Sequence, residues 1–356
     1  MSNTGNSQDV TENDGDKTLT GSESVLSTGD PEENVTAVEG EEDKYGEILI
    51  IDPETEELDL NHQRIRKLEN LEPLTKIERL YFRWNLIKKI ENLHTLVTLK
   101  ELELYDNQIT VIENLDTLVN LEILDLSFNR IREIGGLQNL QKLEKLFLSS
   151  NKIAKIENVN CLKKLVLLEL GDNKLRKIEN LEGLDTLRHL YLGKNKITKI
   201  ENLESLKQLE ILSLQSNRIT KIENLEELTA LDQLYLSENG ISVMEGLEHN
   251  KQLSTLDVGS NKIQRISNTE HLERLEEFWM NDNLVDDWSN VEVLTRNRRL
   301  VTVYLERNPV SKDVNYRRKL KLMLPWISQI DATLCVSPTH GGMFLAGDHT
   351  LGFRCS

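Results

Sequence analysis

An asparagine recurs every 22 residues through most of this 356-residue chain, and this period restricts the possible folds more than any other feature. Gln63 holds the equivalent place one period before the first of these asparagines, and Asn308 follows the last after 25 residues. The pattern therefore has twelve copies. A fixed period of about 20 to 50 residues is typical of chains in which each repeat stacks on its neighbours. The evenly spaced positions are Asn85, Asn107, Asn129, Asn151, Asn173, Asn195, Asn217, Asn239, Asn261 and Asn283.

Apolar residues keep fixed places around each asparagine. Leucine or an equivalent residue lies five and three positions before it, Ile, Leu or Val lies two positions after it, and another apolar residue lies five positions after it, often within "KIENL". This is the leucine-rich-repeat pattern LxxLxLxxNxI. It predicts an α/β fold, a curved leucine-rich-repeat solenoid. Each LxL segment would form a short strand of a parallel concave sheet, and a short helical or 3₁₀ stretch would return on the convex side.

The two ends differ from the repeats. Residues 1–45 hold twelve acidic residues and two lysines and are predicted to be disordered. Ser27 and Thr36 each have an acidic residue three positions on, which leads to the hypothesis of phosphorylation there. We assign 46–308 to the twelve repeats with an N-terminal cap over 46–53, and 309–333 to a C-terminal cap. Residues 334–356 leave the repeat register and are predicted to be an unstructured tail.

The C-terminal cap is expected to be an amphipathic helix. Tyr316, Leu320, Met323 and Leu324 lie at helical spacing on one inward face, and Pro325 should end the helix. A cap of this kind covers the apolar core that the last repeat would otherwise expose to water.

Charge and cysteine content exclude several classes of function. The formal net charge is −17 and the isoelectric point is near 5.0, which argues against direct binding to nucleic acid or to an anionic membrane. The three cysteines have no paired spacing, which fits a reducing compartment. The N-terminus does not resemble a signal peptide, and no apolar run approaches the length of about 18 residues that spans a bilayer. We expect a soluble intracellular protein.

The residue between the two strand leucines should project onto the concave surface, because side chains alternate along a strand. Six of these twelve slots are aromatic and most of the others are carboxylates. Aromatic residues are tolerated in any parallel sheet, but exposed rings among charges are also the usual composition of protein-binding surfaces. We favour a protein-binding face, to which Glu277 would add. The slots are Asp59, Tyr81, Glu103, Asp125, Phe147, Glu169, Tyr191, Ser213, Tyr235, Asp257, Trp279 and Tyr304.

No motif for catalysis or metal binding is present. The seven histidines lack HxH or HExxH spacing, and neither a GxSxG motif nor a phosphate-binding P-loop occurs. Gly135 and Gly136 replace the usual "EN" of one repeat. An open, solvated face also lacks the partly dry pocket that catalysis usually requires. We therefore expect a protein that is not an enzyme and that has no metal site and no cofactor.

The segments "EFWMNDN", "TVYLERNP" and "NPxxxDxxYRRKxxxxLPxxxxIDAT", together with the 22-residue repeats, resemble the leucine-rich-repeat regulatory subunits of protein phosphatase 1 over residues 45–333. The resemblance implies a regulatory subunit whose concave face docks the catalytic subunit of this Ser/Thr phosphatase and controls its activity, assembly or localisation. It implies location in nucleus and cytoplasm, and a further inhibitor protein as an additional candidate partner. The tail after Thr333 departs from the family.

The residues of this chain that match the family's contact positions are Asp125, Phe147, Glu169, Tyr191, Asp257, Glu277, Trp279 and Tyr304. Tyr191 stands where the family can have phenylalanine. The usual docking motif of phosphatase regulators, a basic residue followed by Val/Ile-x-Phe/Trp, is absent from the sequence. The alternative hypothesis is a leucine-rich-repeat scaffold of a ribonucleoprotein or cytoskeletal complex that holds a helix or small domain in its concavity.

Overall fold

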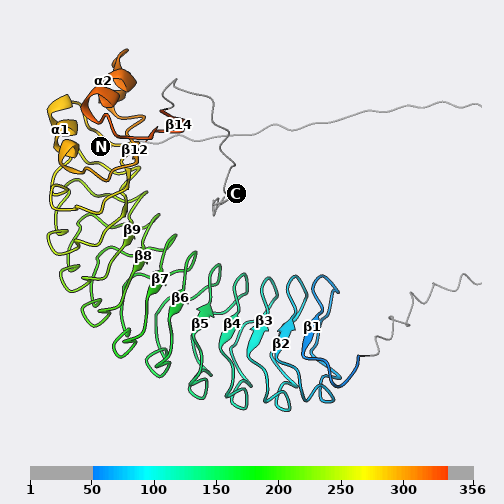
Figure 1. Cartoon of the computed structure of the whole chain (residues 1–356). Helices are drawn as coiled ribbons and strands as arrows, with labels where there is room; N and C mark the ends of the chain where they lie inside the picture. Colours follow the sequence, from blue (N-terminus) through cyan, green and yellow to red (C-terminus); the bar gives the residue numbers. More distant parts are fainter. Residues whose placement is uncertain (1–50, 336–356) are drawn as a thin grey trace, which may run out of the picture. The chain divides into compact units, whose positions relative to one another are not determined.

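The computed structural model describes residues 51–335. The acidic segment 1–45, with Ser27 and Thr36, lies outside the described residues, and so do most of the expected N-terminal cap and the tail from residue 336. Figure 1 shows the described repeats as a curved array with the strands on its inner side. No helix within 51–335 has the length and apolar character needed to cross a membrane.

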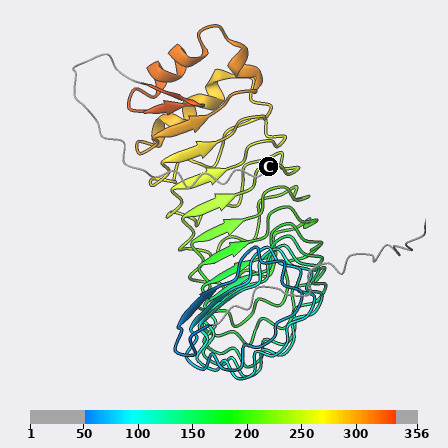
Figure 2. The same ribbon diagram turned by 90° about the vertical axis from the view of Figure 1, so that its right-hand side faces the viewer.

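Fourteen strands form one sheet in sequence order. Strands β1 to β12 pair in parallel, one from each predicted repeat, β13 continues in parallel, and β14 pairs antiparallel with β13. Figure 2 shows them stacked along one side of the array. The strands are β1 (Glu57–Asp59), β2 (Arg79–Tyr81), β3 (Glu101–Glu103), β4 (Ile123–Asp125), β5 (Lys145–Phe147), β6 (Leu167–Glu169), β7 (His189–Tyr191), β8 (Ile211–Ser213), β9 (Gln233–Tyr235), β10 (Thr255–Asp257), β11 (Glu277–Trp279), β12 (Thr302–Tyr304), β13 (Gln329–Ile330) and β14 (Thr333–Leu334).

The core is a continuous stack of leucine and isoleucine. The middle residue of every strand from β2 to β12 is fully buried, as are nearly all apolar positions of the repeat pattern. Leu124 and Leu126, on either side of Asp125, are both 0% exposed. One 22-residue turn could not cover its own leucines, so the core exists only because neighbouring turns share it.

The ladder asparagines join each turn to the one before it. Asn173 Oδ1 accepts the Ile153 N–H at 2.9 Å, and its Nδ2 donates to the carbonyl oxygens of Leu148, Leu170 and Gly171 at 2.9 to 3.2 Å. Equivalent bonds recur along the array. These side chains are therefore structural, since each one satisfies backbone groups that the turns bury.

A second set of asparagines, from the "IEN" segments, forms another ladder. Asn180 has a φ of +58°, and its Nδ2 donates to the Ile156 carbonyl at 2.7 Å. Asparagine suits this position because it tolerates the left-handed conformation and also supplies a donor. Glycine replaces it in two repeats, as Gly136 with a φ of +66° and as Gly246 with a φ of +72°, and a Cβ at Gly136 would lie 2.6 Å from the Ile112 carbonyl oxygen. The chain therefore passes too close to the previous turn for a side chain at this point.

The convex side is made of hydrogen-bonded turns rather than continuous helices. Leu96 N–H donates to the Leu93 carbonyl at 3.0 Å, and Leu99 N–H donates to the Leu96 carbonyl at 3.1 Å. These are bonds of the 3₁₀ type, but in the 22-residue repeats they form separate turns. The one longer interval, from Asn283 to Asn308, contains helix α1 (Trp288–Glu292) and the 3₁₀ helix η1 (Val293–Arg296). The extra residues there provide the length that a helix needs.

The C-terminal cap consists of the 3₁₀ helix η2 (Pro309–Lys312) and helix α2 (Tyr316–Met323). Tyr316, Leu320 and Leu324 are buried, and Met323 packs against the core while partly exposed, so the predicted inward face is confirmed. The helix ends at Met323, with Leu324 as its C-cap directly before Pro325.

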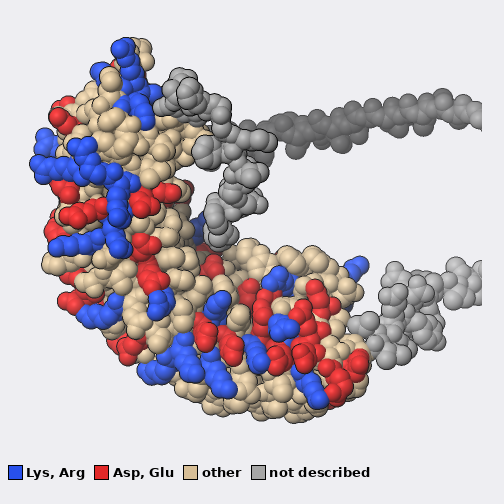
Figure 3. Space-filling view, in the orientation of Figure 1, with Lys and Arg blue, Asp and Glu red and all other residues tan. Residues whose placement is uncertain are grey.

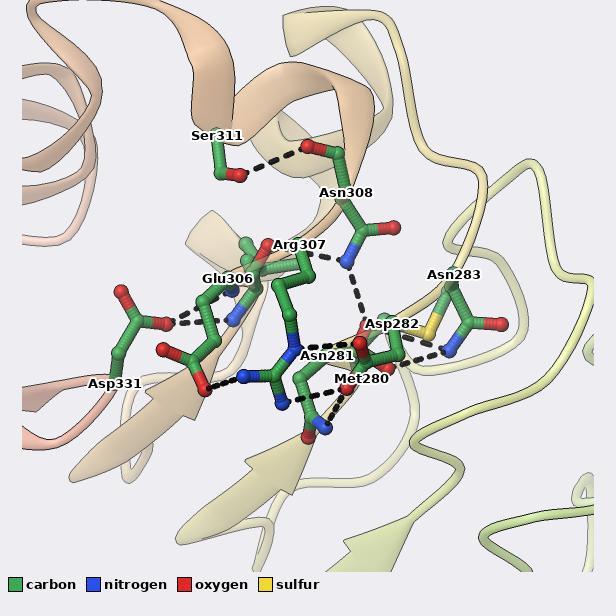
Figure 4. A network of polar contacts seen from close by, with 10 residues as sticks. Met280, Asn281, Asp282, Asn283, Glu306, Arg307, Asn308, Ser311 and Asp331 are labelled. Carbon is green, nitrogen blue, oxygen red and sulfur yellow. Dashed lines mark hydrogen bonds and ion pairs between the residues drawn. The ribbon is translucent and has the colours of Figure 1, made fainter.

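Asp331 closes the last full turn. Its Oδ1 accepts the N–H groups of Leu305 and Glu306 at 2.9 and 3.0 Å, and the Tyr316 hydroxyl donates to the same oxygen at 3.2 Å. Figure 4 shows this carboxylate beside the neighbouring network, in which Arg307 bridges Asp282 and Glu306. The cap is thus held by buried polar contacts as well as by apolar packing.

Candidate protein-binding face

The twelve predicted slots lie on one surface. Each is the third residue of a strand from β1 to β12, and the strands pair in exact register, so that Asp125 lies opposite Phe147 and Phe147 opposite Glu169. Because the middle residue of each strand points into the core, the third residue must point the other way, onto the concave sheet. The structure therefore confirms the side-chain parity that the sequence predicted. We call these twelve residues the outer column.

The first residue of each strand lies on the same surface two positions earlier and forms a second column. Glu277 belongs to it and lies opposite Thr255 and Thr302 of the adjacent strands. Sequence reasoning placed only Glu277 here and missed the others, although alternation along the strand could have found them. In the middle of the array this column contains Ile123, Leu167 and Ile211, all half-buried. It adds apolar area beside the aromatic and acidic outer column.

Trp279 and Tyr304 form an aromatic pair near the C-terminal end of the face. Their strands are adjacent, and the ring centroids lie 5.8 Å apart at an interplanar angle of 55°. The Tyr304 hydroxyl accepts a hydrogen bond from Gln329 Nε2 at 3.0 Å. The indole N–H of Trp279 has no acceptor within 51–335. Both rings are half-buried, so they offer apolar area to a partner without being part of the core.

The aspartates of the outer column have a local role that sequence reasoning missed. Asp59, Asp125 and Asp257 each accept, through Oδ1, the backbone N–H two residues further on, at 2.8 to 2.9 Å. This Asx-type bond ends the strand and starts the turn. Glutamate is too long for the same bond. The identity of the residue as aspartate thus has a structural cause. Asp59 is exposed and Asp125 is half-buried on the concave side, whereas the predicted contact residue Asp257 is buried, with only 7% of its surface exposed.

Burial raises the pKa of several of these carboxyl groups. Burial raises the pKa of Asp125, and Glu103 nearby adds to the rise. The pKa of Glu169 is raised by its burial and then by the negative charge of Asp125. Burial likewise raises the pKa of Asp257. A neighbouring cation favours the charged form of a carboxyl group. Arg83, which is paired with Glu103, opposes the rise at Asp125, but only as the smallest of the contributions to that pKa. A cationic group of a binding partner would therefore stabilise the charged form of these carboxylates.

The tyrosines of the outer column are also partly shielded from water. Burial raises the pKa of Tyr191, with a smaller contribution from Glu169. Burial, followed by Glu277, raises the pKa of Tyr235 to about 12, and its hydroxyl donates to Gln233 Oε1 at 3.0 Å. Both side chains are therefore neutral at physiological pH, and they act as flat rings with a polar tip.

The described residues offer little for chemistry. Within 51–335, no group of three or more His, Cys, Asp or Glu side chains is placed to hold a metal ion. His189, at the start of β7, lies 3.8 Å from Glu210 on the solvated face. Figure 3 shows acidic and basic side chains interspersed over the face of the repeats in view, with lysine and arginine gathered over α2.

Comparison with known proteins supports the repeat fold. A family described as "Leucine-rich repeat" matches residues 204–333, and one described as "Leucine Rich repeats (2 copies)" matches residues 97–139. Among solved structures, an internalin (InlF) of Listeria monocytogenes superimposes with a TM-score of 0.64 and 26% identity, over 78% of this chain and 87% of that one. A leucine-rich-repeat protein of Leptospira interrogans superimposes with a TM-score of 0.60 and 22% identity, over 73% of each chain.

Curated relatives match a short part of the chain at high identity. Protein phosphatase 1 regulatory subunit 7 of Xenopus tropicalis is 58% identical over 50 residues, and the human protein of the same name is 56% identical over 50 residues. The zebrafish (Danio rerio) protein is 54% identical over 46 residues. The matched segments span 14%, 14% and 13% of these relatives' lengths and of this chain. These relatives are named regulatory subunits, and the fold is a repeat scaffold rather than that of an enzyme family.

Proposed function

We propose that this leucine-rich-repeat chain is a non-enzymatic regulatory subunit that docks the catalytic subunit of Ser/Thr protein phosphatase 1 on its concave face. The observation that carries the proposal is geometric. The eight residues inferred as contacts occupy two adjacent columns on one continuous surface, between β4 and β12. The relatives that match part of the chain are named regulatory subunits of this phosphatase, which supports the choice of partner.

The face divides into an anchor and a charged region. Trp279 and Tyr304 provide the aromatic anchor, and truncation of such a residue typically weakens binding by about 2 to 4 kcal/mol. Asp125 and Glu169 lie several strands away, beside Phe147. Their charges favour a basic patch on the phosphatase and act mainly on the association rate. From β4 to β12 the strands cover about 38 Å at roughly 4.8 Å per step, enough for an extended interface.

The regulatory role follows from occupation of the partner's surface rather than from chemistry on this chain. A subunit of this kind would control the activity, assembly or localisation of the catalytic subunit in nucleus and cytoplasm. A further inhibitor protein could then bind the same phosphatase, provided that it uses a surface the solenoid leaves open.

Binding by the double variant Trp279→Ala/Tyr304→Ala tests the proposal. Purified variant and wild-type chains would be titrated with the phosphatase 1 catalytic subunit on a biosensor, with circular dichroism to check folding. We expect the affinity to fall at least about thirtyfold, which corresponds to the loss of one anchor residue. Val111→Ala is the matched control, because Val111 is exposed but lies outside the strands. A folded double variant that keeps wild-type affinity would disprove the assignment of the site.

A pull-down from cell extract distinguishes the proposal from a ribonucleoprotein scaffold. Phosphatase should be retained by the wild-type chain with or without ribonuclease. Retention that disappears after ribonuclease treatment would instead favour the scaffold.

A further inference from the structure

An exposed row of aromatic rings lies beside the concave face, in the first four repeats. It consists of His62, Trp84, Tyr105 and Phe128, and we call it the aromatic edge. The His62 and Trp84 rings are parallel, with centroids 4.3 Å apart, the Trp84 and Tyr105 centroids are 5.5 Å apart, and those of Tyr105 and Phe128 are 4.8 Å apart. Trp84 is 41% exposed and Phe128 is 46% exposed. The row is thus a contiguous apolar patch in contact with water.

The fold itself does not require aromatic residues at these turns. His62, Trp84 and Phe128 have φ values of +59°, +54° and +55°, a left-handed conformation that bulky residues rarely adopt. The residue before the ladder asparagine has this conformation along the array, and small or charged residues fill it elsewhere. An exposed ring in a costly conformation points to a binding role. The other residues at this place are Asp106, Ser150, Asp172, Lys194, Ser216, Glu238, Ser260, Asp282 and Arg307.

A basic hollow lies next to the aromatic edge along the chain. Arg66, Lys67, Lys88 and Lys89 line it together with Leu86, Gln108 and Glu91, and its volume is about 520 Å³. Leu86 follows Trp84 by two residues, and His62 belongs to the same repeat as Arg66 and Lys67. The chain segments that follow β1 and β2 therefore each contribute residues to both the aromatic edge and the hollow.

The positive charge of the hollow is only weakly compensated. The Lys67 ammonium lies 3.6 Å from a carboxylate oxygen of Glu69, and the Lys89 ammonium lies 3.8 Å from one of Glu91. The side chains of Lys67, Glu69 and Lys89 are more than half exposed, and that of Glu91 is 29% exposed. Pairs of this length and exposure contribute little to stability and break readily for a better partner. A doubly charged phosphate would meet several basic groups here at once, and arginine can bind it in a bidentate manner.

We propose that the aromatic edge and the basic hollow together bind a phosphorylated protein segment, with the phosphate in the hollow and an apolar side chain against Trp84. The proposal rests on the proposed function for its purpose, because such a site would hold a phosphoprotein beside a docked phosphatase. A protein segment fits better than single-stranded nucleic acid. The rings already contact one another, so a base could not enter between them, and the chain as a whole carries a net charge of −17.

Two pairs of variants separate the two parts of the site. Lys88→Glu/Lys89→Glu reverses charge in the hollow, and Arg176→Glu/Lys177→Glu makes the same change at the equivalent positions four repeats later. Trp84→Asn/Phe128→Asn removes two rings, and asparagine keeps the left-handed conformation. Ser150→Asn/Ser260→Asn is its control at the same place in other repeats.

The probe is a fluorescent pool of short peptides with a fixed phosphoserine and degenerate flanks. Its unphosphorylated twin, a twin with glutamate in place of phosphoserine, and a short oligouridylate serve as comparison arms, all measured by anisotropy on the full chain. We expect the phosphorylated pool to bind about tenfold more tightly than the serine pool. Lys88→Glu/Lys89→Glu should abolish this preference, Trp84→Asn/Phe128→Asn should weaken binding several-fold, and both control pairs should bind like wild type.

Three results would overturn this inference. They are no preference for phosphoserine over serine or glutamate, tighter binding of the oligouridylate than of the phosphorylated pool, or an equal loss of peptide affinity in a variant and its control. Phosphatase binding measured on the same variants keeps the two proposals apart. Neither Lys88→Glu/Lys89→Glu nor Trp84→Asn/Phe128→Asn touches the eight concave contacts, so their affinity for the catalytic subunit should stay unchanged. A chain that binds phosphopeptide but not the phosphatase would refute only the proposed function.

Discussion

Asp125 shows how one side chain can serve both the fold and a binding face. Its Oδ1 accepts the Ser127 N–H at 2.8 Å and so helps to end β4. Its charge is costly at this place, because burial raises its pKa above the ordinary value of 3.8. Asparagine could make the same hydrogen bond without the charge. The carboxylate is therefore explained by the turn only in part, and its charge fits a role in binding.

Asp125→Asn should stabilise the fold while weakening association with the phosphatase. The raised pKa means that the folded protein binds more protons than the unfolded chain between pH 3.8 and the folded pKa, so wild-type stability falls as pH rises through this window. The gain from Asp125→Asn should be near zero below the window and largest above it. Denaturant midpoints at acidic and neutral pH would measure this gain.

Asp59→Asn is the matched control for this prediction. Asp59 makes the same bond to the N–H two residues on, at 2.9 Å, but its side chain is exposed. Because this carboxylate is exposed, its substitution should change stability little. Equal pH-dependent gains in the two variants would show that burial of Asp125 is not the cause.

At the scale of elements, the ladder asparagines determine how one turn attaches to the next. A single Asn173 side chain replaces backbone pairing in the turns after β5 and β6, where the chain changes direction and cannot continue the sheet. The length of each repeat determines the structure of the convex side.

Twenty-two residues suffice for a strand, two asparagine turns and isolated 3₁₀-type bonds, whereas α1 forms only in the longer interval before Asn308.

Asn173→Ala should lower the free energy of unfolding by about 2 to 3 kcal/mol, because it leaves buried backbone groups without partners. Asn120→Ala is the control, since the Asn120 side chain makes only exposed hydrogen bonds: Nδ2 donates to the Val97 carbonyl and Oδ1 accepts from Lys142 Nζ. That change should cost less than about 1 kcal/mol. Chemical denaturation measures both. Similar losses would contradict a specific role for the ladder.

At the scale of the whole repeat array, stability depends on closing the last repeat. The core is continuous from Leu68 to Ile330, and each turn contacts only its neighbours, so an open end exposes both apolar side chains and a sheet edge. Asp331 and Tyr316 hold the cap over this end.

Asp331→Ala should therefore lower stability by about 2 to 3 kcal/mol, because the buried N–H groups of Leu305 and Glu306 lose their acceptor. It should also promote self-association through the exposed edge, which light scattering would detect. Asp282→Ala is the control, because Asp282 and Asp331 both have a left-handed backbone (φ +55° and +50°) and both variants therefore carry the same backbone cost. Beyond that cost, Asp282→Ala removes a surface ion pair with Arg307 worth less than about 1 kcal/mol and a hydrogen bond from Asn281. A monodisperse, fully stable Asp331→Ala variant would show that apolar packing alone holds the cap.

The positions of all twelve residues of the outer column could be predicted from the sequence, but the hydrogen bonds that their side chains make could not. Leu124 and Leu126 at strand spacing suffice to place Asp125 outward, and the 22-residue period extends that result to Trp279 and Tyr304. Sequence reasoning did not foresee the Asx-type bonds of the aspartates, because that bond depends on the turn geometry after the strand. It also left Trp84 and Phe128 without a role, because their alignment with His62 and Tyr105 becomes visible only across stacked turns.

The sequence alone determined the register of the twelve repeats and which side chain of each strand faces inward, because both follow from the covalent spacing of residues along a strand. The tertiary structure decided what those outward side chains meet. The raised pKa values of Asp125 and Glu169, the Trp279–Tyr304 pair and the aromatic edge all arise between residues about 22 or more positions apart. Their proximity depends on how the turns stack, and stacking is set by packing of the shared core rather than by any local pattern.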